Sequence, residues 1–96
     1  MYFVYIIYSS AHNKYYIGQT NNFDLRLIRH NSGTEKYTSP YKPWEKVLVI
    51  KKPTRSEAVI LEGKLKNLNR ERLIQFIEKY KKWTHLGSRR FGLDAD

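Results

Sequence analysis

The stretch Lys14–His30, KYYIGQTNNFDLRLIRH, determines how the rest of the chain can be organised. It predicts a short strand over Lys14–Gly18, followed by a polar turn over Gln19–Asn22. A helix that carries Arg26 and His30 follows the turn. These two residues are four apart, so their side chains lie on one face of that helix. The stretch therefore gathers a tyrosine, a glycine, an arginine and a histidine into one strand–turn–helix unit.

A β-branched and aromatic run precedes this unit. Tyr2–Tyr8 is apolar at successive positions, which predicts a central strand covered on both faces. The turn-like segment after it predicts a hairpin with the strand that begins at Lys14. A four-residue loop over Ser9–His12 would place Tyr5 directly opposite Tyr16, so that both phenols would share one face of the hairpin.

The remainder of the chain predicts one more strand and two more helices. A long polar loop over residues 34–46 leads to a third strand over Val47–Ile50. Thr54 followed by Glu57 matches a capping box. The helix that it opens has an apolar stripe at helical spacing: Ala58, Leu61, Leu65 and Leu68. A third helix is expected over residues 70–83. The predicted fold is therefore a mixed α+β domain, a small three-stranded antiparallel sheet flanked by helices.

Composition limits the class of protein and its partners. Ninety-six residues form one domain, which we expect over residues 1–83, followed by a tail over residues 84–96. The 18 Lys and Arg residues exceed the 9 Asp and Glu residues, so the formal net charge is +9. Such a charge favours a polyanionic partner, DNA or RNA, and an acidic protein is the alternative. The expected contacts with the phosphate backbone are basic residues on the later helices: Lys64, Lys66, Arg70 and Arg72.

The absence of cysteine excludes a disulfide framework and a thiolate metal site. It is consistent with the cytoplasm, where we expect the protein to act. The apolar opening is too short to span a membrane and has no basic segment before it, so we expect neither a signal peptide nor a membrane span.

Five residues have side chains suited to phosphodiester chemistry, and each also has a simpler explanation. Tyr5 and Tyr16 could be ordinary cross-strand neighbours, and Arg26 could be one of many solvated arginines. His30 could be an exposed cation favoured by the helix dipole. Glu62 could pair with a lysine one turn later. Together, however, one carboxylate suits Mg²⁺ or Mn²⁺, and a guanidinium suits phosphate. A phenol beside them could accept a proton near neutrality.

The combined pattern resembles the GIY-YIG nuclease superfamily, and most closely its small single-domain bacterial members. The matching segments are Phe3–Tyr5, Tyr16–Gly18, the Arg26–His30 spacing with the HNSG sequence of His30–Gly33, and Glu62 on a helix. The resemblance implies that Tyr5, Tyr16, Arg26 and His30 are catalytic. It further implies that Glu62 holds a single Mg²⁺ or Mn²⁺ ion, and that Gly18 lets the backbone approach the site.

The implied activity is one-metal hydrolysis of DNA phosphodiester bonds with low sequence specificity, in a structure-specific or repair role. Either tyrosine could be the general base, and we favour Tyr16. Two departures bear on turnover: Gln19 stands where several catalytic members have lysine, and no late asparagine aligns clearly. The alternative is a nucleic-acid-binding module that keeps the fold without turnover. The nuclease hypothesis expects the side chains of Tyr5, Tyr16, Arg26, His30 and Glu62 to converge on one face of the sheet.

Overall fold

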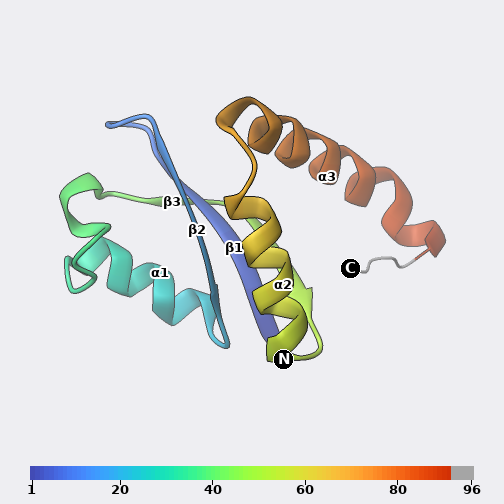
Figure 1. Ribbon diagram of the computed structural model, residues 1–96, viewed down its shortest axis with the longest axis horizontal. Helices are drawn as coiled ribbons and strands as arrows, with labels where there is room; N and C mark the ends of the chain where they lie inside the picture. Colours follow the sequence, from blue (N-terminus) through green and yellow to red (C-terminus); the bar gives the residue numbers. More distant parts are fainter. Residues whose placement is uncertain (92–96) are drawn as a thin grey trace.

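The computed structural model describes the backbone of residues 1–91 and the side chains of residues 1–83. The chain forms a three-stranded antiparallel sheet with helices on both faces (Figure 1), which confirms the predicted fold class. The elements in chain order are β1 (Tyr2–Ser9), β2 (Lys14–Thr20), α1 (Phe23–Ser32), the short 3₁₀ helix η1 (Ser39–Tyr41), β3 (Glu45–Lys52), α2 (Arg55–Lys66) and α3 (Arg70–Phe91).

Strand β1 is the centre of the sheet, whose order is β2-β1-β3. Its residues Val4–Ile7 are buried on both faces, as expected for an uninterrupted β-branched and aromatic run. Alternate side chains therefore point into two separate cores. Strand β2 is at the edge of the sheet, so it pairs with a neighbouring strand along one edge only.

The predicted pairing of β1 with β2 is wrong by two residues. Tyr5 pairs with Gly18, and Tyr16 pairs with Ile7. The loop still has four residues but begins one position later, because Asn13 adopts a left-handed conformation with φ of 53° before β2 starts, which asparagine tolerates. The Tyr8 hydroxyl donates to the Asn13 side-chain oxygen at 2.6 Å and holds this turn. A shift of two residues preserves the face of every side chain.

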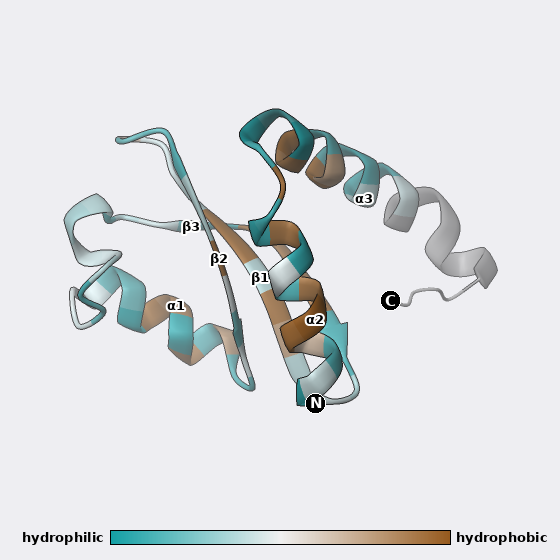
Figure 2. Ribbon diagram, viewed as in Figure 1, coloured by the Kyte–Doolittle hydropathy of each residue, from teal (hydrophilic) through white to brown (hydrophobic). Residues whose placement is uncertain are grey.

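Each face of the sheet has its own core. Val4, Ile6 and Ile17 pack with Ala58 and other residues of α2 and α3 on one face. On the opposite face, a second core of Tyr5, Ile7 and Trp44 packs with partly buried residues that include Phe23 and Leu27 of α1. Figure 1 shows α1 and α2 on opposite sides of the sheet. Figure 2 shows apolar residues along β1 and along α2. Helix α1 therefore packs on one face of the sheet, and α2 and α3 pack on the other.

Local capping places the start of each helix. Asn22, the last residue of the predicted polar turn, caps α1, and its side chain accepts from the Leu25 amide at 3.1 Å. Gly33 ends α1 with φ of 88°, a conformation that favours glycine. Leu25 and Ile28 are exposed, because only one narrow face of α1 meets the sheet.

The caps of α2 and α3 follow the sequence patterns. Thr54 accepts from the Glu57 amide at 3.2 Å, and Asn69 accepts from the Arg72 amide at 2.8 Å. Helix α3 continues to Phe91, eight residues beyond the expected end. The domain boundary after residue 83 therefore stays a prediction, and the last five residues of the expected tail lie outside the described residues. Among the described residues, no helix is long and apolar enough to cross a membrane.

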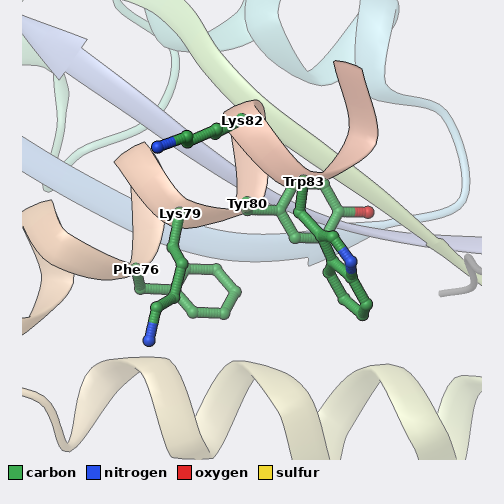
Figure 3. A pocket seen from close by; sticks show the side chains of 5 residues that line it. All are labelled: Phe76, Lys79, Tyr80, Lys82 and Trp83. Atoms are coloured by element: carbon green, nitrogen blue, oxygen red, sulfur yellow. The ribbon is translucent and has the colours of Figure 1, made fainter. Parts of the chain in front are cut away.

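A pocket of about 570 Å³ lies along α3, where Phe76 and Trp83 point toward α2 (Figure 3). Tyr80, Lys79 and Lys82 complete its lining. Phe76 and Tyr80 also pack against the core that α2 shares with the sheet. The pocket is therefore on the face of the sheet opposite Tyr5, away from the tyrosine cluster described next.

Candidate active site

Tyr5 lies at the centre of the candidate site and is fully buried. Its ring passes directly over Gly18, the residue opposite it on β2. A Cβ atom at position 18 would lie 2.5 Å from the Tyr5 hydroxyl and 2.6 Å from Cζ. Such contacts are far closer than atoms in proteins tolerate, so the ring can occupy this position only above a residue without a side chain. Glycine is required here by the packing of Tyr5.

His30 is buried with 1% of its surface exposed and bridges Tyr5 to the loop after α1. Its Nε2 atom is 2.9 Å from the Tyr5 hydroxyl, and its Nδ1 atom is 2.7 Å from Oγ1 of Thr38. The explanation of His30 as an exposed helix-end cation is therefore wrong. Burial lowers the pKa of His30; Arg26 lowers it further, and Glu35 acts in the opposite direction. The ring is accordingly neutral near pH 7.

Burial also raises the pKa of the Tyr5 phenol well above its usual value, and the neighbouring Tyr16 phenol adds to this effect. Arg26 opposes the shift through its charge and a hydrogen bond to the phenol, but burial prevails. Tyr5 therefore keeps its proton, and its hydroxyl is hydrogen-bonded to Nε2 of His30. In the neutral ring one nitrogen donates and the other accepts. Either Tyr5 donates to Nε2 while Nδ1 donates to Thr38, or Thr38 donates to Nδ1 while Nε2 donates to Tyr5.

The polar loop over residues 34–46 is attached to the end of α1 at several points. The side chain of Asn31 donates to the carbonyl of Trp44 at 2.9 Å and accepts from its amide at 2.5 Å. The indole nitrogen of Trp44 donates to the carbonyl of Thr38 at 2.9 Å. These contacts explain the HNSG sequence, because His30 and Asn31 both bind the loop and Gly33 ends the helix. They hold Thr38 against His30.

Tyr16 is half-buried beside this network. Its ring centroid lies 5.2 Å from that of His30 and 6.3 Å from that of Tyr5. Further ring contacts connect it to Trp44 at 6.2 Å and Tyr37 at 5.9 Å. Tyr16 therefore joins the buried network to the surface, with part of its side chain in reach of solvent.

The structure brings together four of the five residues expected to converge. Tyr5, Tyr16 and His30 are in ring contact, and Arg26 of α1 acts on both Tyr5 and His30. Arg26 is half-buried rather than fully solvated. The fifth residue, Glu62, belongs to α2, which packs on the opposite face of the sheet. The four residues of the hairpin and α1 therefore lie on one face of the sheet, as expected, whereas Glu62 does not lie with them.

Glu62 is at the margin of the buried face of α2, and its side chain is 19% exposed. Its Oε2 atom is 3.2 Å from the ammonium nitrogen of Lys66, the lysine one turn later. Among the described residues, no group of three or more His, Cys, Asp or Glu side chains is arranged to hold a metal ion. A single, partly exposed carboxylate nevertheless fits Mg²⁺, which takes one or two protein carboxylates and fills its other positions with water and phosphate oxygens.

The expected nucleic-acid contacts differ in their surroundings. Lys64 and Arg72 are exposed on α2 and α3, and Lys66 is exposed beside Glu62. Arg70 instead supports the fold, because its guanidinium donates to the carbonyl of Asn13 at 3.1 Å and lies 5.1 Å from the ring centroid of Tyr15. This contact fastens the start of α3 to the end of the hairpin.

Sequence reasoning missed Thr38 and Glu35. Thr38 has 1% of its surface exposed and is the hydrogen-bond partner of His30. Glu35 belongs to the loop that holds Thr38 and Trp44 against the end of α1, and its charge raises the pKa of both Tyr5 and His30. Both residues come from the long polar loop, whose length and position before Trp44 were the only sequence signal for a functional segment.

Comparison with known proteins identifies one family model and several bacterial relatives. The family model of the GIY-YIG catalytic domain matches residues 1–85. The chain is 32% identical over 78 residues to the UPF0213 protein SH2523 of Staphylococcus haemolyticus, which covers 80% of this chain and 94% of that protein. A UPF0213 protein of Staphylococcus epidermidis has the same identity and coverage. The solution NMR structure of the UPF0213 protein BH0048 from Bacillus halodurans is similar with a TM-score of 0.56 and 30% identity, over 91% of this chain and 98% of that one.

Proposed function

Because this chain belongs to the GIY-YIG family, we propose that it is a metal-dependent endonuclease that hydrolyses DNA phosphodiester bonds by a one-metal mechanism. The observation that supports this most is the cluster of Tyr5, Tyr16, Arg26 and His30 on one face of the sheet. A buried, hydrogen-bonded network beneath a half-exposed phenol and a guanidinium is suited to phosphate chemistry. In this proposal the enzyme has little sequence specificity and serves a structure-specific or repair role.

Each residue has a distinct part in the proposed reaction. Arg26 binds the oxygens of the scissile phosphate and offsets their developing charge. Tyr16, which reaches solvent, acts as general base in its phenolate form, taking the proton of the attacking water and becoming the neutral phenol. Tyr5 positions Tyr16 and Arg26, and His30 orients Tyr5 through its hydrogen bond. A Mg²⁺ or Mn²⁺ ion held by Glu62 would supply Lewis acidity to the phosphate.

The charge of the molecule supports a nucleic-acid substrate. A net charge of +9 on 96 residues attracts a polyanion, and the exposed Lys64, Lys66 and Arg72 supply contacts to its backbone. The protein acts in the cytoplasm in this proposal, and the absence of cysteine is consistent with a reducing compartment.

The test is a nicking assay with purified protein, on supercoiled plasmid and on branched and single-stranded DNA, with Mg²⁺ or Mn²⁺. Cleavage should be lost in Arg26→Ala, while DNA binding measured without divalent ion should persist. Binding by the wild-type protein with no cleavage of any substrate would refute the enzyme and leave the binding module.

The position of Glu62 makes a second comparison necessary. Glu62 is on the face of the sheet opposite Tyr16, so it can act on the same phosphate only around the open edge of β2. Glu35 is a carboxylate whose charge acts on Tyr5. Our proposal expects Glu62→Gln to abolish cleavage and Glu35→Gln to retain it. The opposite result would remove Glu62 from the mechanism.

The same observation favours one alternative function. With Glu62 paired to Lys66 and its helix on the far face, the chain could bind nucleic acid through its basic surface without turnover. Binding that weakens steeply with salt, does not depend on divalent ions and leads to no nicking would identify this function.

A further inference from the structure

A row of exposed aromatic rings extends from the candidate site to the end of the hairpin. Tyr16 contacts Tyr37 with centroids 5.9 Å apart, and Tyr37 contacts Tyr41 at 6.5 Å. Tyr41 then meets His12 at 5.3 Å, and the Lys14 ammonium lies 4.8 Å from the Tyr41 centroid. We call these five residues the aromatic strip. It joins the hairpin to the polar loop and its short helix η1, two segments that are separate in the sequence.

Exposure distinguishes this strip from a hydrophobic core. Tyr37 has 70% of its surface exposed, which is unusual for a large aromatic residue whose purpose is packing. His12 and Lys14 are exposed as well, and Tyr41 is half-buried. Only Tyr16, at the inner end, contacts the buried network of Tyr5 and His30. The strip thus presents ring surface to solvent along its outer part and reaches the candidate site at its inner end.

We propose that the aromatic strip binds unpaired bases of a single-stranded nucleic acid next to the phosphate at Tyr16. This inference rests on the proposed function, because it assigns a substrate form to the same site. Aromatic rings in a row with a cation among them are the features that bind single strands, since every unpaired base offers a flat face for stacking. In a duplex those faces are covered by neighbouring bases, so the strip selects for unpaired segments.

Charge supports a nucleic acid over a protein as the occupant. Lys14 belongs to the strip itself, and the whole molecule has a net charge of +9. A strand with bases on the rings keeps its phosphates toward the solvent side, where the lysine can neutralise them. A neutral apolar peptide would gain nothing from that cation, and a basic peptide would be repelled by the charge of the whole surface.

The test is binding measured by fluorescence anisotropy without divalent ion, so that it does not depend on cleavage. The probes are labelled oligothymidylate, oligouridylate, an abasic strand of equal length and a duplex. Tyr37→Ala should weaken binding of the two pyrimidine strands by about 5- to 150-fold, the loss expected for one base–aromatic stack. It should leave the abasic strand and the duplex unchanged, because their contacts are electrostatic. The ratio of the first two probes separates DNA from RNA.

Two variants control this result. Tyr37→Phe keeps the ring and should bind as the wild type does. Ile60→Ala removes a similarly exposed apolar side chain, 57% exposed on α2, and should change nothing. Wild-type binding by Tyr37→Ala, or equal weakening for the abasic strand, would overturn the inference. So would a loss on Trp83→Ala with none on Tyr37→Ala, because the bases would then bind at α3.

The inference and the proposed function can fail separately. Base-dependent binding that requires Tyr37, with no cleavage of any substrate, would establish the strip and refute the nuclease. Cleavage of DNA, with strand binding that does not depend on Tyr37, would support the nuclease and refute the role of the aromatic strip.

Discussion

Replacing Gly18 with alanine tests the packing on which the whole site depends. The new Cβ would lie 2.5 Å from the hydroxyl and 2.6 Å from Cζ of Tyr5, a ring with no exposed surface to move into. Overpacking of this kind costs about 1–3 kcal/mol. Displacing the hydroxyl from His30 removes a hydrogen bond worth roughly 0.5–1.5 kcal/mol. We therefore expect the free energy of unfolding to fall by about 2–4 kcal/mol.

Urea denaturation followed by circular dichroism measures this loss, and the thermal midpoint should fall by roughly 10–30 °C. Gly63→Ala is the matched control, because no atom lies within 4 Å of its added Cβ. That variant should be more stable by about 0.5–1 kcal/mol, since alanine favours the helix. In a Tyr5→Leu background, which lacks Cζ and the hydroxyl, Gly18→Ala should cost much less. An equal cost in both backgrounds, or none in the wild type, would refute this account of Gly18.

Three other predictions concern the same network. Thr38→Val should cost about 1–3 kcal/mol in unfolding free energy, because it leaves Nδ1 of His30 buried without a hydrogen-bond partner; Thr38→Ser should restore both the stability and the ¹⁵N imidazole shifts of the wild type. Burial lowers the pKa of His30, so on acidification the unfolded chain binds this proton before the folded protein does, and the free energy of unfolding should fall as pH falls below about 6.5. In His30→Gln the urea midpoint should therefore change less with pH below pH 7. The same pH dependence in the variant and the wild type would count against a neutral buried ring. Tyr16→Phe should abolish nicking with little change in unfolding free energy, whereas Tyr5→Phe should lower stability by about 1 kcal/mol; the reverse pattern would exchange their roles.

Local patterns were enough to predict the elements and the fold class. β1 is a β-branched and aromatic run, and α2 begins at a threonine cap with a glutamate three residues on; both signals act within a few residues. Helix α1 likewise ends at Gly33, a glycine in the left-handed conformation. The physical causes of these patterns lie within the element itself, so the patterns can be recognised without knowing the tertiary contacts.

The pairing register and the state of His30 could not be predicted in this way. The register depends on the conformation of Asn13, which also binds Arg70 from a helix 57 residues later. The burial of His30 depends on Thr38, which is held in place by the hydrogen bond from Trp44. Neither contact changes the spacing of apolar residues in the sequence, so the sequence pattern does not reveal it. Tertiary contacts therefore decided the features that local sequence left open.

The two tyrosines differ in the surroundings that the fold provides, and this difference divides their chemistry. Tyr5 is a residue of β1 that is buried against α1. Burial raises its pKa, and its hydroxyl is hydrogen-bonded to His30. A group in that state can donate a hydrogen bond but cannot take a proton from water that does not reach it. Tyr16 lies at the boundary, with Tyr5 and His30 behind it and Tyr37 in front. A base must contact the water from which it takes a proton, so the proposed reaction assigns the base to Tyr16 and a buried supporting role to Tyr5.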